Sequence, residues 1–286
     1  HHKYEKDDLP ECLFINPKVK NDYPFKHLSG CGVIWKVCQV LTGENLYEYL
    51  DIVALSTIAD VVKLIGENRV IVKHGLDKIN NTNNKGLKEL IRVKEISRVN
   101  EGDVGYRLAP PINAVGRLGQ ANKGLELLTT DNIYKAGELA NELDVINEKR
   151  KRMQKENYDS VKEQVNEDDN ILIARGDFKA GIVGLLAGDL KEEYHKPSIV
   201  INENGKGSCR SVKPLHMYHL LKDNEDLLDK YGGHELACGL TIKEGKYKDF
   251  KNRLLKETED IEYQGINFDI EEGEIFAGQS PFTGEM

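Results

Sequence analysis

The fold is decided by the stretch Tyr49-Leu50-Asp51-Ile52-Val53-Ala54-Leu55-Ser56-Thr57-Ile58-Ala59-Asp60-Val61-Val62. Its apolar side chains recur at helical spacing, which predicts a largely buried helix. The same stretch carries two carboxylates, Asp51 and Asp60, and a helix that turns about 100° per residue points them to opposite sides. Asp51 lies near the helix start, so we expect it to meet solvent or to cap the helix.

Asp60 poses a different problem, because it lies between Ala59 and Val61 near the apolar end of the stretch. We expect this carboxylate to be buried, and a buried carboxylate is unfavourable unless a positive group pairs with it. The partner is either a Lys, an Arg or a set of backbone N–H groups, or it is a metal ion. The residues alone favour the first kind of partner, since most buried acids are paired within the protein.

Composition limits the class of protein. The 286 residues are 39% hydrophobic, which is enough for one large or two ordinary domains with proper cores. No apolar run reaches the roughly 18 to 20 residues of a membrane span and no signal peptide is visible, so we expect a cytoplasmic protein with no membrane contact. The net charge of −8 disfavours a nucleic-acid partner without excluding it, because such binding depends on a local basic groove.

The cysteines favour a reducing compartment. They are odd in number, scattered and without any CxxC pair: Cys12, Cys31, Cys38, Cys209 and Cys238. We therefore expect buried thiols rather than disulfides or a zinc site.

Several blocks along the chain match one known family in order. They are His1-His2, the 49–62 helix, Gly66–Leu76, Tyr106–Gly119 (YRLAPPINAVGRLG), Gly207–Ser211 (GSCRS), Tyr231–Ile242 (YGGHELACGLTI) and Ser280–Gly284. In combination they resemble the RecJ-like single-strand-specific exonucleases of the DHH phosphoesterase superfamily, from the middle of the DHH domain onward. The resemblance covers almost the whole chain.

The resemblance implies an α/β protein truncated at both ends. Residues 1–130 correspond to the C-terminal part of a DHH phosphoesterase domain whose first motifs are missing, and residues 167–260 to a smaller α/β DHH-associated domain. A connecting helix lies in residues 131–166, and its apolar stripe runs from Ile133 to about Val165, roughly 45 Å at 1.5 Å per residue. Residues 261–286 lead to an oligonucleotide-binding barrel that is absent.

The resemblance also implies a metal site. His1 and His2 match the two histidines of the Asp-His-His signature, whose Asp lies just before residue 1, and Asp60 matches a further ligand position. These three are the expected catalytic and metal-binding residues, holding two Mn²⁺ or Mg²⁺ ions. Imidazole and carboxylate ligands suit such ions.

A phosphate site is expected around Arg117. Pro110 and Pro111 argue against a helix, so we expect a loop in which Arg117 is flanked by glycines. Glycines let a backbone approach a ligand and Arg matches phosphate, but on chemistry alone a packing loop with a surface Arg is equally open. The resemblance implies that Arg117, with Asn113, belongs to a pocket for the 5′-terminal phosphate of the strand.

The second domain supplies the rest of this expected site. Ser208 and Arg210 lie on the same face of a predicted strand, where they make either a phosphate clamp or an ordinary exposed strand face. His234 follows two glycines, and although a lone His is more often structural, the resemblance implies a phosphate contact. At Lys179 the chain departs from the family, where Trp-His-Pro-Gly is common in place of Phe178–Gly181.

The sequence thus predicts a metal-dependent 5′→3′ exonuclease that hydrolyses single-stranded DNA by a two-metal mechanism, as a monomer, in repair and recombination. Two alternatives stay open. One is a DHH phosphodiesterase for short oligonucleotides or cyclic dinucleotides, and the other is a non-catalytic DNA-binding scaffold.

We expect the 286 residues by themselves to be inactive. Three carboxylates of the family's earlier motifs are not in the sequence, and a two-metal site cannot hold both ions with so few anionic ligands. The measurement is release of nucleotides from single-stranded DNA by the purified chain with Mn²⁺. Metal-dependent release would contradict the prediction.

Overall fold

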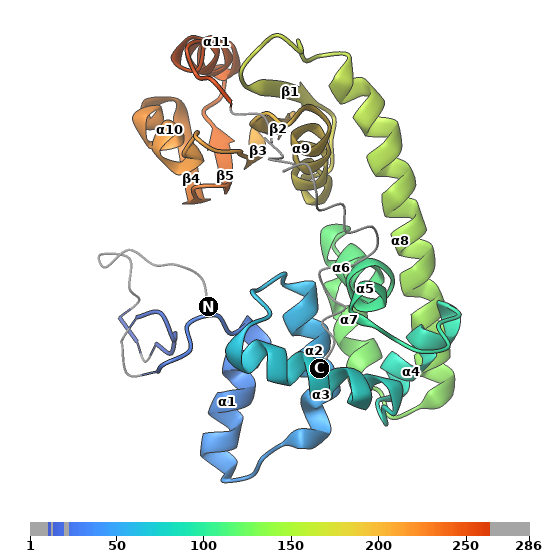
Figure 1. Ribbon diagram of the computed structural model, residues 1–286. Coiled ribbons are helices and arrows are strands. Elements are labelled where there is room, and N and C mark those ends of the chain that lie inside the picture. The colour runs from blue at the N-terminus through green and yellow to red at the C-terminus, as the bar shows by residue number, and fades with distance from the viewer. Residues whose placement is uncertain (1–10, 13, 20–22, 264–286) are drawn as a thin grey trace, which may run out of the picture.

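The computed structural model describes residues 11–12, 14–19 and 23–263, which form two lobes joined by one long helix (Figure 1). The first lobe is helical. Its elements are α1 (Gly30–Thr42), the 3₁₀ turn η2 (Tyr47–Tyr49), α2 (Leu50–Ala59), α3 (Gly66–Asn80), α4 (Lys85–Val93), α5 (Glu101–Asp103), the π-helix η3 (Val104–Leu108), α6 (Ala109–Arg117) and α7 (Ala121–Thr129).

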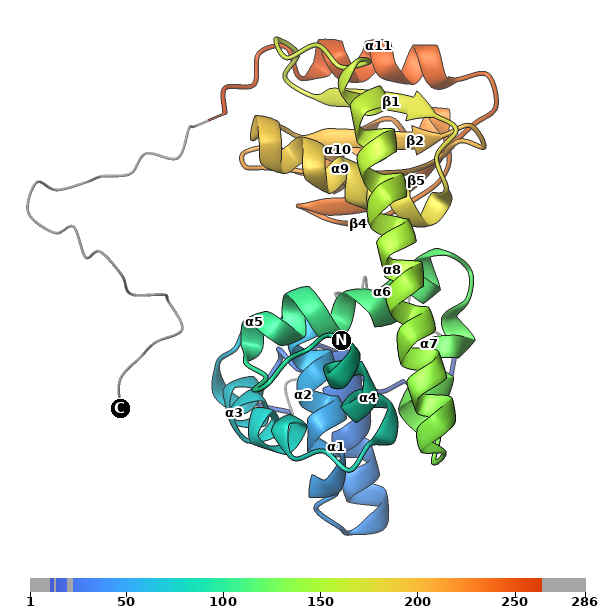
Figure 2. The same ribbon diagram turned by 90° about the vertical axis from the view of Figure 1, so that its right-hand side faces the viewer.

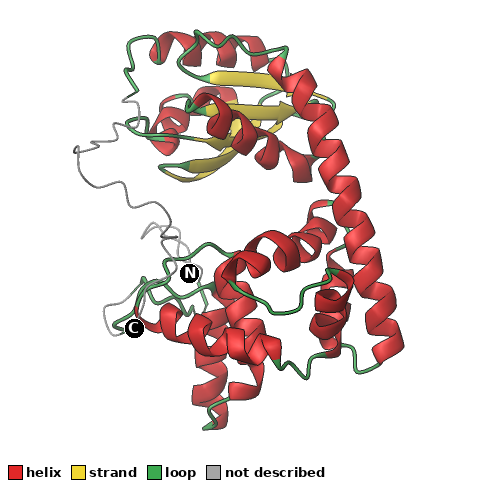
Figure 3. Ribbon diagram, turned by 45° about the vertical axis from the view of Figure 1, so that its right-hand side comes forward, coloured by secondary structure: helices red, strands yellow, loops and turns green. Residues whose placement is uncertain are grey.

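The second lobe holds every strand of the described residues (Figure 3). Its elements are β1 (Leu172–Gly176), α9 (Ala180–Tyr194), β2 (Ser198–Asn202), β3 (Lys206–Arg210), α10 (Met217–Asp223), η4 (Glu225–Leu227), β4 (Leu228–His234), β5 (Ala237–Ile242) and α11 (Tyr247–Glu257). The sheet order is β1-β2-β3-β5-β4; β1 and β2 are parallel and the other pairs antiparallel. The predicted α/β class is confirmed.

The sheet is covered on both faces because successive residues of β1 and β2 alternate between two apolar clusters. Ile173, Ile199 and Ile201 pack with α10 and α11, whereas Leu172 and Val200 pack with α8 and α9. Strands buried on both faces need nearly continuous apolar sequence, as β1 and β2 have.

The long helix α8 (Ile133–Lys162) begins where the sequence predicted and ends slightly earlier. Its first half packs against α4, α6 and α7 and its second half against α9 and β1, so one rigid element spans both lobes (Figure 2). Among the described residues, no helix is long and apolar enough to span a membrane.

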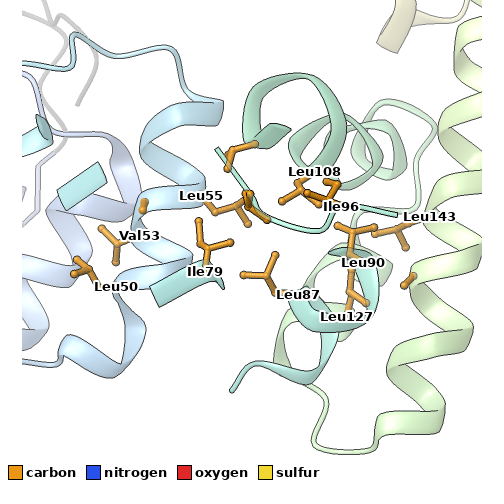
Figure 4. Close-up of a cluster of buried hydrophobic side chains, with 14 of the residues drawn as sticks. Leu50, Val53, Leu55, Ile79, Leu87, Leu90, Ile96, Leu108, Leu127 and Leu143 are labelled. Atoms are coloured by element: carbon orange, nitrogen blue, oxygen red, sulfur yellow. The ribbon is translucent and has the colours of Figure 1, made fainter. Parts of the chain in front are cut away.

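The stretch at 49–62 forms the predicted helix α2, and most of its residues are buried. Leu50, Val53 and Leu55 belong to a core that continues through Ile79 and the helices beyond it to Leu143 of α8 (Figure 4). The first lobe therefore folds around α2 as the sequence indicated.

The expected burial of the two acids of α2 was wrong. Asp51 is only 4% exposed; its Oδ1 accepts the Ile52 N–H at 2.8 Å, and its Oδ2 accepts the hydroxyl of Thr82. Asp60 is exposed, because α2 ends at Ala59 and Val61 takes a left-handed conformation (φ 51°) that turns the chain away. Asp51 does lie at the helix start, but Thr82 rather than solvent meets its carboxylate.

One local expectation was also wrong. Residues 109–117 form helix α6 instead of a loop, because its prolines fall in the first turn, where a missing N–H breaks no hydrogen bond. The residues before α6 form α5 and continue into η3.

The five cysteines are free thiols, as expected. Cys209 and Cys238 are buried opposite each other on β3 and β5, but Cys12 is exposed, so the expectation of buried thiols holds only in part.

Close packing of α2 on α3 depends on Gly75. A Cβ at this position would lie 2.2 Å from the Ala54 Cβ and 2.8 Å from the Leu50 carbonyl oxygen. We expect Gly75→Ala to lower the free energy of unfolding by about 1–3 kcal/mol through overpacking. Gly188→Ala in α9 is the matched control, because a Cβ there meets nothing within 4 Å and alanine is the better helix former. Urea unfolding of both variants checks this; equal stabilities would contradict it.

Candidate functional site

An open pocket of about 520 Å³ lies where the two lobes meet. Residues from α6, α9 and β3 line it: Asn113, Gly116, Arg117, Ala180, Gly181, Val183, Gly184, Gly207, Ser208 and Arg210. The structure thus brings together four of the residues that the sequence singled out for phosphate, although two come from one lobe and two from the other.

Arg117 is placed by contact between α6 and α9. It is the last residue of α6, and its Nη1 donates to the carbonyl oxygen of Gly181 at 3.5 Å. A Cβ at Gly181 would lie 1.9 Å from the Arg117 carbonyl oxygen, so only glycine permits this approach. The end of one helix and the start of the other therefore form one wall of the pocket.

Ser208 and Arg210 line the pocket from the same face of β3. Arg210 Nη1 donates to Ser208 Oγ at 2.9 Å and to the Cys209 carbonyl oxygen at 2.8 Å. A Cβ at Gly184 of α9 would lie 3.1 Å from Ser208 Oγ and 3.3 Å from Arg210 Nη2. The absence of a side chain at Gly184 thus leaves the hydroxyl and the guanidinium accessible.

The electrostatics of the pocket favour an anion. Burial lowers the pKa of Arg117, and the nearby charges of Arg150 and Arg210 lower it further. The described residues that line the pocket include no Asp or Glu. The start of α9 also lies here without a side-chain cap, and uncapped N–H groups at a helix start attract negative charge.

His234 lies outside this pocket. It ends β4 opposite Ala237, which itself pairs with Arg210, so His234 and Arg210 share a sheet face two strands apart, about 10 Å at the usual strand spacing. His234 is exposed, and its Nδ1 accepts the N–H of Leu236 at 3.3 Å.

On the sheet face between Ser208 and β4, the neighbouring positions are glycines and carry no side chains. Ser208 pairs with Gly239, which pairs with Gly232, and a Cβ at Gly232 would meet nothing within 4 Å. A ligand can therefore approach the backbone closely beside the pocket. Lys179, the departure from the family pattern, precedes α9 and is exposed; it is not among the residues that line the pocket.

The expected metal ligands are not assembled in the described residues. Asp60 is exposed at the end of α2, and His1 and His2 lie outside the part of the chain that the structure describes. Within that part, no group of three or more His, Cys, Asp or Glu side chains could hold a metal ion. Asp60 therefore does not form a metal site with described residues alone.

Arg150 is a residue that the sequence analysis missed. It lies in the charged run of α8, which resembles a solvated helix face, yet it is half-buried and its charge acts on Arg117. The sequence signal for Arg150 was Asn147, which lies one turn earlier on the buried face of the same helix. A buried amide needs a hydrogen-bond partner, and Arg150 provides it.

Comparisons of the sequence and the structure with known proteins all point to the same family. Residues 168–261 match the model of the DHHA1 domain. The chain is 35% identical to the single-stranded-DNA-specific exonuclease RecJ of Bacillus subtilis (strain 168), over 97% of this chain and 37% of that protein. It is 34% identical to the protein of the same name from Escherichia coli (strain K12), over 88% of this chain and 50% of that protein. The chain thus spans half or less of the length of these curated relatives.

Solved structures similar to this chain carry the same name as its curated relatives. RecJ from Thermus thermophilus in complex with Mn²⁺ matches 92% of this chain and 41% of its own, with a TM-score of 0.85 and 31% identity. A crystal structure of exonuclease RecJ bound to manganese matches 92% of this chain and 68% of its own, with a TM-score of 0.77 and 31% identity.

Proposed function

Because the chain belongs to the RecJ family of DHH phosphoesterases, we propose that it is part of a metal-dependent 5′→3′ exonuclease that hydrolyses single-stranded DNA in repair and recombination. The observation that carries the proposal is the pocket of Arg117, Ser208 and Arg210 between the lobes. The proposal includes the domain division expected from the sequence: 1–130, 131–166, 167–260 and 261–286.

The pocket receives the 5′-terminal phosphate of the strand. The two guanidiniums offer N–H groups that match phosphate oxygens, and the Ser208 hydroxyl offers a further donor. Asn113 lines the same wall as Arg117. Holding one end of the strand in this way gives the enzyme its polarity, since only a 5′ end presents its phosphate in the required position.

The rest of the strand extends from the pocket along both lobes. The bare sheet face at Gly239 and Gly232 lets the sugar-phosphate backbone approach, and His234 at its far side contacts a further phosphate. On the other lobe, η3 links α6 to the end of α2, where Gly105 approaches Ile58. Asp60 and the phosphate pocket therefore belong to one continuous part of the first lobe.

His1, His2 and Asp60 contribute ligands for two ions, Mn²⁺ or Mg²⁺; RecJ from Thermus thermophilus has been crystallised in complex with each of these metals. Such ions activate a water and neutralise charge on the scissile phosphate. His1 and His2 lie outside the described residues, within which no group of three or more His, Cys, Asp or Glu side chains could hold a metal ion. The protein acts in the cytoplasm as a monomer, without membrane contact.

The test is a nuclease assay on a full-length version of the protein. A long single-stranded oligonucleotide labelled at its 3′ end should shorten progressively from the 5′ end, EDTA should stop the reaction, and duplex DNA should resist it. Hydrolysis restricted to dinucleotides or cyclic dinucleotides would support the phosphodiesterase alternative. Metal-independent binding without cleavage would support the scaffold.

A further inference from the structure

Gly184 of α9 leaves an open space in front of β3. It lines the phosphate pocket one turn after Gly181, where a Cβ would meet the backbone of Arg117. At Gly184 the three nearest atoms belong to side chains instead: Ser208 Oγ at 3.1 Å, Arg210 Nη2 at 3.3 Å and Ser208 Cβ at 3.6 Å. The nearest neighbours of the missing side chain are therefore the two side chains of β3 that line the pocket.

Both of these side chains have donors to spare. Within the described residues, the side-chain hydrogen bonds of Arg210 all come from Nη1, which donates to Ser208 Oγ and to the Cys209 carbonyl oxygen. Its Nη2, the nitrogen nearest to Gly184, donates to none of these residues. Ser208 Oγ accepts from Arg210, and its own hydrogen has no acceptor among them. Two unused donors thus flank the space beside Gly184.

This space suits an oxygen of a phosphate group. An oxygen approaches a Cα–H group to about 3.3–3.6 Å, and only a glycine exposes its Cα on the side where other residues carry a side chain. The Cβ position itself lies close to both donors, so an oxygen that enters beside it can accept from both. A methyl group at residue 184 would project about 1.5 Å, one carbon–carbon bond, into this approach.

We propose that Gly184 is a specificity-determining residue of the phosphate pocket, an inference that rests on the proposed function. Because Gly184 has no side chain, a terminal phosphate rests against the backbone of α9 and accepts hydrogen bonds from Ser208 Oγ and Arg210 Nη2 together. A terminal phosphate offers three acceptor oxygens, which a 5′-hydroxyl end lacks. Gly184 thereby lets the pocket select a phosphorylated strand end.

The test measures binding by a full-length version of the protein in EDTA, which removes divalent metal and so prevents cleavage. The ligands are oligodeoxythymidylates labelled with fluorescein at the 3′ end, with either a phosphate or a hydroxyl group at the 5′ end. Fluorescence anisotropy gives both Kd values, and their ratio is the preference for the phosphorylated end. Gly184→Ala should reduce this preference about tenfold, as expected for a lost charge-assisted contact, and should leave the Kd of the hydroxyl end nearly unchanged.

Gly188→Ala is the matched control, because it makes the same change one turn further along α9. Both substitutions favour the helix, but a Cβ at Gly188 meets nothing within 4 Å and this residue does not line the pocket. The control should keep the preference. If folded Gly184→Ala keeps the preference too, or weakens binding of both ends equally, the inference is wrong although the pocket stands. If the wild-type protein does not distinguish the two ends, the proposed pocket fails as well.

A double-mutant cycle separates obstruction of the pocket from a general disturbance of α9. Ser208→Ala removes the atom closest to the added methyl group and one of the two donors. In that background Gly184→Ala should cause a smaller reduction of the preference, since only Arg210 Nη2 is left to obstruct. If the two reductions simply multiply, the residues act independently and the inference is wrong. If Gly184→Ala alone does not fold, the comparison within the Ser208→Ala background decides, and an unchanged preference there overturns the inference.

Discussion

Asp60→Ala in a full-length version of this protein is expected to reduce Mn²⁺-dependent cleavage of single-stranded DNA to background while leaving the fold intact. The carboxylate is exposed at the end of α2, so its loss removes no buried contact of the core. As a proposed metal ligand, however, it supplies negative charge that the ions require. The measurements are cleavage rate and melting temperature of the variant.

Asp51→Ala provides the contrast. Asp51 is buried and accepts hydrogen bonds from Thr82 and from the Ile52 N–H, so its loss leaves two partly buried donors unpaired and should lower the free energy of unfolding by about 1–3 kcal/mol. Glu48 is an exposed acid near the other end of α2. Glu48→Ala should change neither the cleavage rate nor the melting temperature. Full cleavage by folded Asp60→Ala would remove this residue from the proposed metal site.

Arg210→Ala should weaken capture of a 5′-phosphorylated end roughly tenfold or more, since a charge-assisted contact to phosphate contributes about 1.5 to 3 kcal/mol. The test compares 5′-phosphorylated with 5′-hydroxyl single strands as substrates of a full-length version. The preference for the phosphorylated end should fall, and the Mn²⁺ concentration required for activity should stay unchanged, because Arg210 ends β3 in the second lobe whereas Asp60 follows α2 in the first lobe.

Lys206→Ala is the control for this prediction. Lys206 is an exposed cation on the same strand and face as Arg210, but it does not line the pocket. Its loss should affect both substrates alike. If Arg210→Ala also slows both substrates equally, the arginine is a general backbone contact and the pocket assignment is wrong.

Local patterns were sufficient for much of the fold and for part of the candidate site. Helical periodicity located α2 and α8, because an apolar stripe reflects one continuous buried face. Strand alternation placed Ser208 and Arg210 on one face, which the pocket confirms as a shared wall. The assignment of phosphate to these residues came from the family resemblance and stays a proposal.

Tertiary structure decided what depends on partners distant in sequence. Whether Asp51 or Asp60 is buried follows from Thr82 and from the turn at Val61, which the periodicity of α2 does not contain. The half-burial of Arg150 is likewise not predictable from a charged run until α6 and α9 pack beside α8.

The sequence by itself determined the helices α2 and α8, the shared strand face of Ser208 and Arg210 and the residue types suited to phosphate, because these depend on near neighbours along the chain. Only the tertiary structure decided that the two halves of the pocket meet. Arg117 and Gly181 are far apart in sequence, and their contact exists because α6 and α9 both pack on α8 and a glycine lets one backbone approach the other.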